Sequence, residues 1–411
     1  MKMMFRYELK KVFAKTGGKV ALFLLLFFIG VTCYFATNVT YVNEQGKTEA
    51  GPFAVSRLKA MQKEWAGYLD EETIQRVISE NKKIRTSPEA MSEDVLLKDI
   101  AYGRGQGIQE IRNLLNCSYA AHFREYDYYR ADSLSENDAP AFYSNRVSLL
   151  AQWLEEEADE LFSEEEKEYL IGQYSRLQTP FYYDYMKGWT QLFEYAPTII
   201  MITMLILGYL VSGIFSNEFS WKSDAIFFTS VYGRNRAVRT KLKSAFFIVT
   251  VIYWAAVLLY TLFTLLYLGA DGWECPVQAD FSGWKCFYNI TVWQKYILIV
   301  AGGYIGCLFI SSLGMLVSAK TKSAVLAVMV PFVLIFIPSF LSNINSPAVS
   351  KILGLLPDQL LQAGTALSYF TLYSLGGKVW GAIPILLVIY PLLTLLIAPV
   401  TYREYRHKEI S

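Results

Sequence analysis

Apolar side chains in this chain are grouped in six long runs instead of short alternating patterns. Each run holds about 20 residues with few charges, the length that an α-helix needs to cross a hydrocarbon layer about 30 Å thick. The pattern predicts an all-α polytopic membrane protein with six transmembrane helices. The expected spans, numbered one to six in chain order, are residues 18–37, 195–216, 244–269, 296–318, 323–341 and 379–400.

The composition agrees with this pattern, because 53% of the 411 residues are hydrophobic while the net charge is only +1. The first apolar run follows a basic leader and could be read as a secretory signal peptide. Its apolar stretch is longer than the roughly 7–15 residues of such a signal, which favours a retained span.

Basic side chains gather beside alternate ends of the runs. They precede span one and follow spans two, four and six, whereas residues 38–194 carry more acidic than basic side chains. Since Lys and Arg favour the cytoplasmic side of a membrane, both termini, the loop 217–243 and the tail 401–411 are expected in the cytoplasm. The segments 38–194, 270–295 and 342–378 are then expected outside. Anchoring of this topology is assigned to Lys10, Lys11, Arg236, Arg239 and Lys241.

Residues 1–17 predict an amphipathic elbow helix. Phe5, Leu9 and Val12 recur at helical spacing, while Arg6 and Lys10 fall on another face. This pattern is typical of a helix that lies in the membrane surface. A plain topology-setting leader is the alternative interpretation.

Residues 38–194 predict a mainly helical extracellular domain large enough to bury its own core. Its acidic run, 155–170, is interpreted as a solvated helix face. Aromatic residues just before span two fit an interfacial belt, and Pro197 is expected in the first turn of that span.

Glycines and prolines indicate how the later spans pack. Gly302 and Gly306 in span four form a small-xxx-small pair that allows close helix packing. Prolines in spans five and six predict kinks at Pro331, Pro338, Pro384, Pro391 and Pro399. The apolar segment 342–378 predicts two short re-entrant helices.

The cysteines and histidines of this chain offer few candidates for a disulfide or a metal site. Cys275 and Cys286 share the loop 270–295, where either a disulfide or two unpaired thiols are expected. No metal site is expected, because metal-ligand spacing is missing and the chain has only two histidines.

No nucleotide site is expected in this chain either. The only Gly-Lys-Thr sequence, 46–48, has Tyr41 where a phosphate-binding loop needs glycine. No other catalytic motif appears, so the chain is not expected to be an enzyme and needs no cofactor of its own. The apolar runs from span two to span six contain no ionisable residue, which disfavours an ion-coupled carrier.

The loop 217–243 holds the candidate functional residues. A short helix is expected from Ser216 or Asn217, and Gly233 is expected to end it in a left-handed conformation. The basic residues that follow lie too close to the membrane for nucleic-acid binding. The candidate coupling residues are Glu218, Phe219, Trp221, Ile226, Gly233 and Arg234.

This arrangement resembles the permease subunits of ABC-2-type exporters. Their loop between spans two and three often has an acidic residue, a short coupling helix, a Gly-Arg turn and a Lys before span three, matched here by Glu218, Gly233, Arg234 and Lys241. The large domain and the Tyr183-Asp184 and Gly188-Trp189 pairs are similar to a Firmicute-type branch. The resemblance implies a bacterial plasma-membrane exporter of peptides, antibiotics or other amphipathic molecules. It also implies a second permease subunit, identical or different, and separate ATPase subunits that bind ATP and Mg²⁺.

Two other interpretations stay open. The chain could be a membrane-anchored sensor or immunity protein that binds a ligand through its extracellular domain without transport. It could also be a secondary carrier, which the absence of charges inside the spans disfavours.

Overall fold

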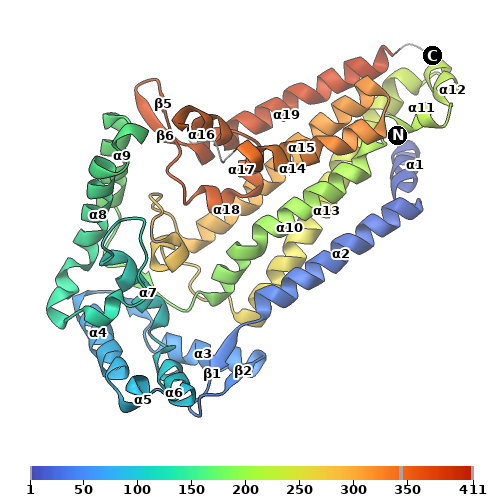
Figure 1. Cartoon of the computed structure of the whole chain (residues 1–411). Coiled ribbons are helices and arrows are strands. Elements are labelled where there is room, and N and C mark those ends of the chain that lie inside the picture. The colour runs from blue at the N-terminus through green and yellow to red at the C-terminus, as the bar shows by residue number, and fades with distance from the viewer. Residues whose placement is uncertain (1, 342–345, 409–411) are drawn as a thin grey trace.

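The computed structural model describes residues 2–341 and 346–408 and is mostly helical (Figure 1). The parts of the predicted segments that fall on residues 1, 342–345 and 409–411 lie outside the described residues. Among the described residues, six helices are long and apolar enough to cross a membrane, in agreement with the six predicted spans, and this indicates a multi-pass membrane protein. They are α2 (Thr16–Thr37), α10 (Lys187–Ser212), α13 (Val238–Leu268), α14 (Val292–Thr321), α15 (Ala324–Leu341) and α19 (Ala382–Arg406).

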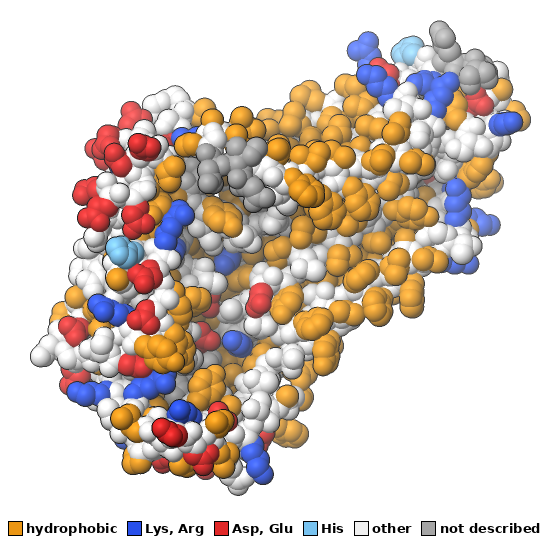
Figure 2. All heavy atoms as spheres, viewed as in Figure 1, with side chains coloured by type: hydrophobic (Ala, Val, Ile, Leu, Met, Phe, Trp, Pro, Cys, Tyr) orange, Lys and Arg blue, Asp and Glu red, His pale blue; other side chains and the backbone are white. Residues whose placement is uncertain are grey.

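The six helices form one bundle with an apolar outer surface. Figure 2 shows this surface as a band of hydrophobic side chains, with charged side chains gathered at the two ends of the bundle. Leu262 on α13, Phe332 on α15 and Leu395 on α19 are among the exposed members of the band. Such a surface is stable against hydrocarbon and not against water.

The span boundaries differ from the prediction at the polar ends. Helix α10 begins at Lys187, so Pro197 lies inside the helix and not in its first turn. Helix α13 begins at Val238, which places Lys241 within the helix. The apolar runs underestimate the lengths of these two helices, because the helix ends are buried by protein and tolerate polar residues. Helices α15 and α19 continue through their prolines, so the kinks stay a prediction.

Residues 38–186 form a mainly helical unit, named here the polar domain. Its helix starts are readable in the sequence: the Asp70 carboxylate accepts from the Thr73 N–H at 2.9 Å, and Ser163 with Glu166 forms a capping box. Its helices are α3 (Pro52–Lys63), α4 (Glu71–Arg85), α5 (Pro88–Met91), α6 (Val95–Gly105), α7 (Gln109–Ser118), α8 (Phe142–Glu156) and α9 (Glu164–Ser175), with 3₁₀ turns at Arg130–Ser133, Glu136–Ala141 and Asp159–Leu161. Two short antiparallel pairs complete it, β1 (Thr40–Val42) with β2 (Thr48–Ala50) and β3 (Gly67–Tyr68) with β4 (Tyr182–Tyr183).

The polar domain is joined to the bundle through the loop between α13 and α14. The buried Arg146 guanidinium on α8 donates to the Trp284 and Cys286 carbonyls at 2.9–3.1 Å. Cys275 and Cys286 in this loop are buried, free thiols in the structure, so the disulfide left open by the sequence is not formed. The loop contains two 3₁₀ turns, Val277–Ala279 and Phe281–Gly283.

The segment between α15 and α19 holds more structure than the two expected helices. It contains α16 (Pro347–Leu353), α17 (Asp358–Leu361), α18 (Ala363–Ala366) and the hairpin of β5 (Leu372–Leu375) and β6 (Lys378–Gly381). Gly376 and Gly377 close the hairpin with φ values of 59° and 72°. A Gly-Gly pair between two alternating runs is a known hairpin signal, which the sequence analysis did not use.

Gly302 and Gly306 on α14 face this segment. A Cβ at Gly302 would lie 3.3 Å from the Leu360 carbonyl oxygen, and one at Gly306 would lie 2.9 Å from the Leu361 side chain. The two glycines therefore make room for α17 within the same chain.

Candidate functional site at the basic end of the bundle

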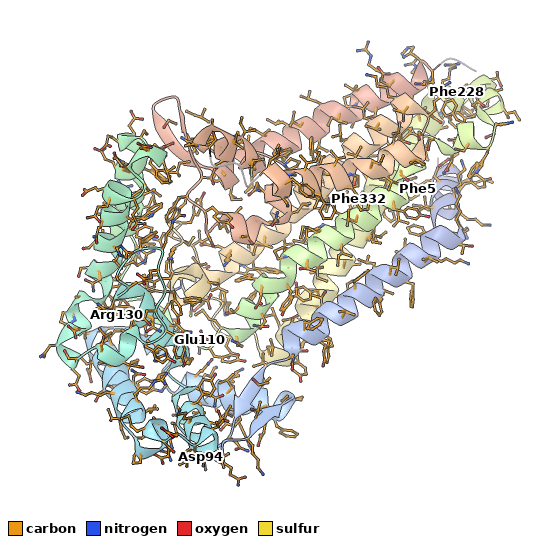
Figure 3. All side chains as sticks on the ribbon, in the orientation of Figure 1. Phe5, Asp94, Glu110, Arg130, Phe228 and Phe332 are labelled. Atoms are coloured by element: carbon orange, nitrogen blue, oxygen red, sulfur yellow. The ribbon has the colours of Figure 1, made fainter. Side chains whose placement is uncertain are left out.

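Three segments that are distant in the sequence meet at the end of the bundle opposite the polar domain, named here the basic end (Figure 1). They are α1 (Lys2–Phe13), the loop from α11 (Asn217–Ser220) through α12 (Asp224–Thr229) to the π-turn Gly233–Ala237, and the last turns of α19. Phe5 on α1 and Phe228 on α12 mark this end in Figure 3. All six candidate coupling residues lie in this loop.

The loop contains two short helices and not the single helix that the sequence predicted. Lys222 adopts a left-handed conformation with φ of 51° between them. The Ser223 N–H donates to the Glu218 carbonyl at 2.9 Å, which closes α11 and turns the chain into α12. As a result, Trp221 does not stack in line with Phe228. Its exposed ring lies under the Lys15 ammonium, 4.4 Å from the ring centre.

A buried ion cluster joins the loop to the bundle. One Glu218 carboxylate oxygen accepts from the Lys241 ammonium at 2.7 Å and from the Lys11 ammonium at 3.0 Å. The other oxygen accepts from the Tyr405 hydroxyl at 3.1 Å. Glu8 of α1 completes the cluster, 3.0 Å from Lys11 and 3.4 Å from Lys241. Glu218 thus links α11 to α1, α13 and α19.

Lys241 and Lys11 therefore have a different environment from the one predicted. Both were expected as topology anchors near the membrane surface. Lys241 is fully buried and also donates to the Ile214 carbonyl at 2.6 Å. Its charge is neutralised by Glu218 and Glu8, so Lys241 is not available to lipid headgroups. Of the neighbouring lysines Lys10 and Lys11 on α1, only Lys10 is exposed.

The charges of the cluster hold one another ionised. Burial by itself raises the pKa of the Glu218 carboxyl, but the charges and hydrogen bonds of Lys241 and Lys11 outweigh it, and the pKa lies below its ordinary value. Burial likewise opposes protonation of Lys11, yet Glu218 and Glu8 raise the pKa of its ammonium. Glu218 and Lys11 are therefore both ionised at neutral pH.

Aromatic rings pack against the Tyr405 side of the cluster. The Tyr405 ring lies 4.9 Å from the Phe215 ring and 5.3 Å from the Phe228 ring, and Phe219 packs 5.9 Å from Phe228. Ion pairs are stronger in such surroundings than in water, and an unpaired partner is correspondingly costly.

Gly233 and Arg234 fix the turn that leads into α13, for a reason other than the predicted one. Gly233 does not have the positive φ of a left-handed residue. A Cβ at this position would instead lie 1.7 Å from the Phe227 carbonyl oxygen, so the turn requires glycine because of close backbone approach. The Arg234 guanidinium donates to the Arg406 and Lys408 carbonyls at 2.8 and 3.1 Å, which ties the turn to the end of α19.

The side of the loop away from the bundle carries exposed apolar side chains. Ile226 is 76% exposed, Val231 is 89% exposed and Tyr232 is half exposed. These three residues are named the α12 patch. Arg236 lies over the Tyr232 ring, and Arg239 lies over the Tyr402 ring of α19, so the patch has a cationic border.

Glu8 and Tyr405 are site residues that the sequence analysis missed. Glu8 is the only acidic residue of α1, and an isolated acid on a basic helix is a usable signal for a specific partner. Tyr405 carried no signal, because tyrosines are common near the ends of these spans. Within the described residues, no group of His, Cys, Asp and Glu side chains could hold a metal ion.

Comparisons with protein-family models, with curated proteins and with solved structures find no match to this chain. The functional argument therefore rests on the sequence and the structure of this chain.

Proposed function

We propose that this chain is the permease subunit of an ABC-2-type exporter whose energy comes from a separate ATPase subunit. Support for the orientation comes from the basic end, because Lys and Arg favour the cytoplasmic side. In this orientation α1, the loop with α11 and α12, and the end of α19 lie in the cytoplasm, and the polar domain is extracellular. In this proposal α1 is the elbow helix and α16 to α18 form the re-entrant segment.

The observation that carries the proposal is the α12 patch on a loop that is firmly attached to the spans. Exposed apolar side chains beyond the membrane band favour contact with another protein. The Glu218 cluster connects the same loop to spans three and six through Lys241 and Tyr405. A partner that pushes on α12 would therefore move α13 and α19 together with α1.

In the proposed mechanism, each of two paired permeases places α12 in a cleft of an ATPase subunit. ATP binding draws the ATPase subunits together, and the ion cluster transmits the displacement to the spans. The apolar bundle favours a peptide, an antibiotic or another amphipathic molecule as cargo. No catalytic residue or cofactor is assigned to this chain.

The test is purification of the native complex, with ATP hydrolysis as the readout. We expect the wild-type protein to carry an ATPase subunit, and Ile226→Asp to lower the co-purified hydrolysis at least about tenfold by placing a charge in the contact. Phe53→Asp is the matched control, since Phe53 is 85% exposed on α3 of the polar domain. Wild-type protein without ATPase activity, or full activity in Ile226→Asp, would contradict the proposal.

The main alternative is a membrane-anchored sensor or immunity protein. It requires ligand binding by the polar domain and no transport. Vesicles containing the purified complex distinguish the two, because only the exporter moves an amphipathic dye or peptide against its gradient when ATP is supplied.

A second candidate, a proton-coupled carrier, is favoured by one residue. Asp358 on α17 is 3% exposed, and its Oδ1 atom has no hydrogen-bond partner, while its Oδ2 atom accepts from the Gln359 amide at 2.9 Å. Burial raises the pKa of this carboxyl to about 6. Transport driven by a proton gradient without ATP, and lost in Asp358→Asn, would favour the carrier over the exporter.

A further inference from the structure

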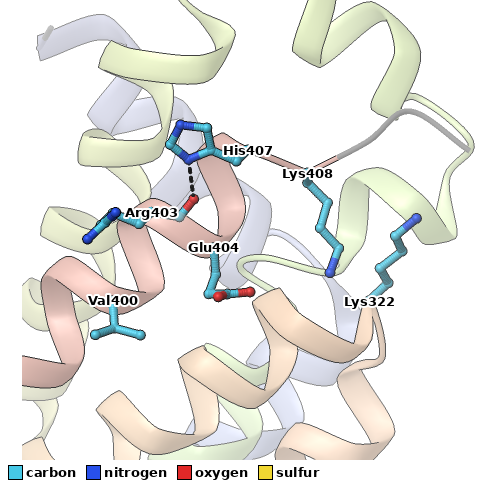
Figure 4. Close-up of a pocket in the computed structure, with 6 residues that line it drawn as sticks. All are labelled: Lys322, Val400, Arg403, Glu404, His407 and Lys408. Carbon is cyan, nitrogen blue, oxygen red and sulfur yellow. Dashed lines mark hydrogen bonds between the residues drawn. The ribbon is translucent and has the colours of Figure 1, made fainter.

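A cationic cleft lies at the basic end, and none of the α12 patch residues lines it. It is formed where α14 passes into α15 and where α19 ends, and it has a volume of about 610 Å³. Figure 4 shows the residues that line it: Lys322, Val400, Arg403, Glu404, His407 and Lys408.

The cleft has an excess of positive charge without matching carboxylates. Lys322, Arg403 and Lys408 outnumber Glu404, the one acidic lining residue. Within the residues that the structure describes, no ion pair within 4.0 Å joins these three cations to a carboxylate. The Lys408 ammonium donates only to the Lys320 carbonyl, at 2.8 Å. Burial and the nearby charge of Lys322 lower the pKa of Lys408 by more than the Glu404 carboxylate raises it, so an anion here would relieve repulsion.

Exposed apolar side chains continue from the cleft along the bundle. Val325 and Met329 on α15 are 71% and 55% exposed, and Leu396 and Val400 on α19 are 63% and 46% exposed. The cleft therefore stands at the boundary between the apolar band and the charged end (Figure 2). Phe332, labelled in Figure 3, continues the apolar face of α15 away from the cleft.

We infer that this cleft binds the phosphate headgroup of an anionic phospholipid, whose acyl chains lie along α15 and α19. Lys and Arg side chains at the polar end of a span attract anionic headgroups, and the guanidinium of Arg403 suits phosphate oxygens. A soluble phosphate would use the cations but not the apolar faces. An acidic protein segment would likewise leave those faces unused.

The experiment measures lipid retention by the purified protein in detergent. Phosphatidylglycerol, phosphatidylcholine and glycerol phosphate are titrated, and bound lipid is counted by native mass spectrometry together with the melting temperature. We expect phosphatidylglycerol to bind and stabilise the protein, and the other two compounds to do neither.

The test variant replaces all three cations by glutamine, as K322Q/R403Q/K408Q. Because each cation near a membrane surface contributes to headgroup attraction, we expect phosphatidylglycerol affinity to fall on the order of a hundredfold. Arg406→Gln is the matched control, since Arg406 is exposed on the same helical turn but does not line the cleft. The control is expected to bind like the wild type. The unliganded melting temperature of each variant verifies that it is folded, and Arg403→Gln alone provides a milder variant with a smaller loss.

Four outcomes would overturn the inference. The triple variant could retain phosphatidylglycerol as well as the wild type does. Phosphatidylcholine could bind equally well, which would show that the apolar faces act alone, or glycerol phosphate could bind equally well, which would show a site for soluble anions. Loss of a co-purifying ATPase with unchanged lipid binding would identify the cleft as a protein contact.

Discussion

The two ends of the helix bundle are held together in different ways. At the basic end, the single Glu218 carboxylate contacts side chains from α1, α13 and α19 beside a group of packed aromatic rings. At the other end, the polar domain is attached by several separate contacts, including Arg146 to two carbonyls and Glu166 to Lys351 at 2.8 Å. The first joint is centred on one carboxylate, whereas the second is shared among many groups. Single substitutions should therefore have a large effect at the first and graded effects at the second.

The largest effect is expected for Glu218→Gln. This change leaves Lys241 buried with only Glu8 as a charged partner, and breaking a buried pair costs about 3–5 kcal/mol. The melting temperature of the purified protein should fall markedly. Glu194→Gln is the control. It removes an exposed carboxylate near the N-terminal end of α10 and should leave the melting temperature unchanged.

A second substitution separates charge from shape in this cluster. Adding Lys241→Met to Glu218→Gln removes the uncompensated ammonium, so the double variant should be more stable than Glu218→Gln alone. If the double variant is the less stable of the two, the loss reflects packing and not an unpaired charge.

The pH dependence of stability gives the next test of the same cluster. The folded-state pKa of Glu218 is depressed, so its contribution is present above the unfolded pKa of about 4.3 and is lost as pH falls through the folded value. The difference in melting temperature between wild type and Glu218→Gln should therefore be full at pH 6 and shrink below about pH 4. A difference that is constant over this range would show that the pKa of Glu218 is the same in the folded and unfolded protein.

The sequence predicted the spans and the location of this site, but not its pairing. Apolar runs of span length report burial in hydrocarbon directly, and Glu218 was singled out as the acid at the start of the short helix expected after span two. Its partner Lys11, however, lies 207 residues away, and no periodic pattern identifies a partner at that distance. Lys241 was assigned to topology anchoring because its neighbours are basic, whereas its position on α13 turns it inward.

The sequence also did not predict the close backbone contact at Gly233 or the contacts that attach the polar domain. Gly233 was singled out for a left-handed turn, but the closeness of the Phe227 carbonyl is what requires glycine. Glu166 belongs to an acidic run that was interpreted as solvated, yet it is 2% exposed. A charge count does not show which member of such a run faces a lysine on another segment.

At the domain joint, Arg146→Met should have a moderate effect. It leaves the Trp284 and Cys286 carbonyls without their cationic donor, which costs about 2 kcal/mol when the acceptors are buried. Hydrogen exchange should rise in the loop 270–291, and protection of α13 and α14 should persist. Arg176→Met, at an exposed position on the same domain, is the control and should leave exchange unchanged.

The smallest effect is expected for Lys351→Ala on α16. The Lys351 side chain is 42% exposed, so solvent screens its attraction to Glu166, and such pairs contribute about 0–1 kcal/mol. Glu166 keeps its bond from the Ser163 N–H at 3.1 Å, which satisfies one of its oxygens after the lysine is removed. The melting temperature should change no more than in Lys378→Ala, a neighbouring exposed position on β6. A loss as large as that of Glu218→Gln would show that the domain joint also depends on a single ion pair, and the contrast between the two ends would no longer hold.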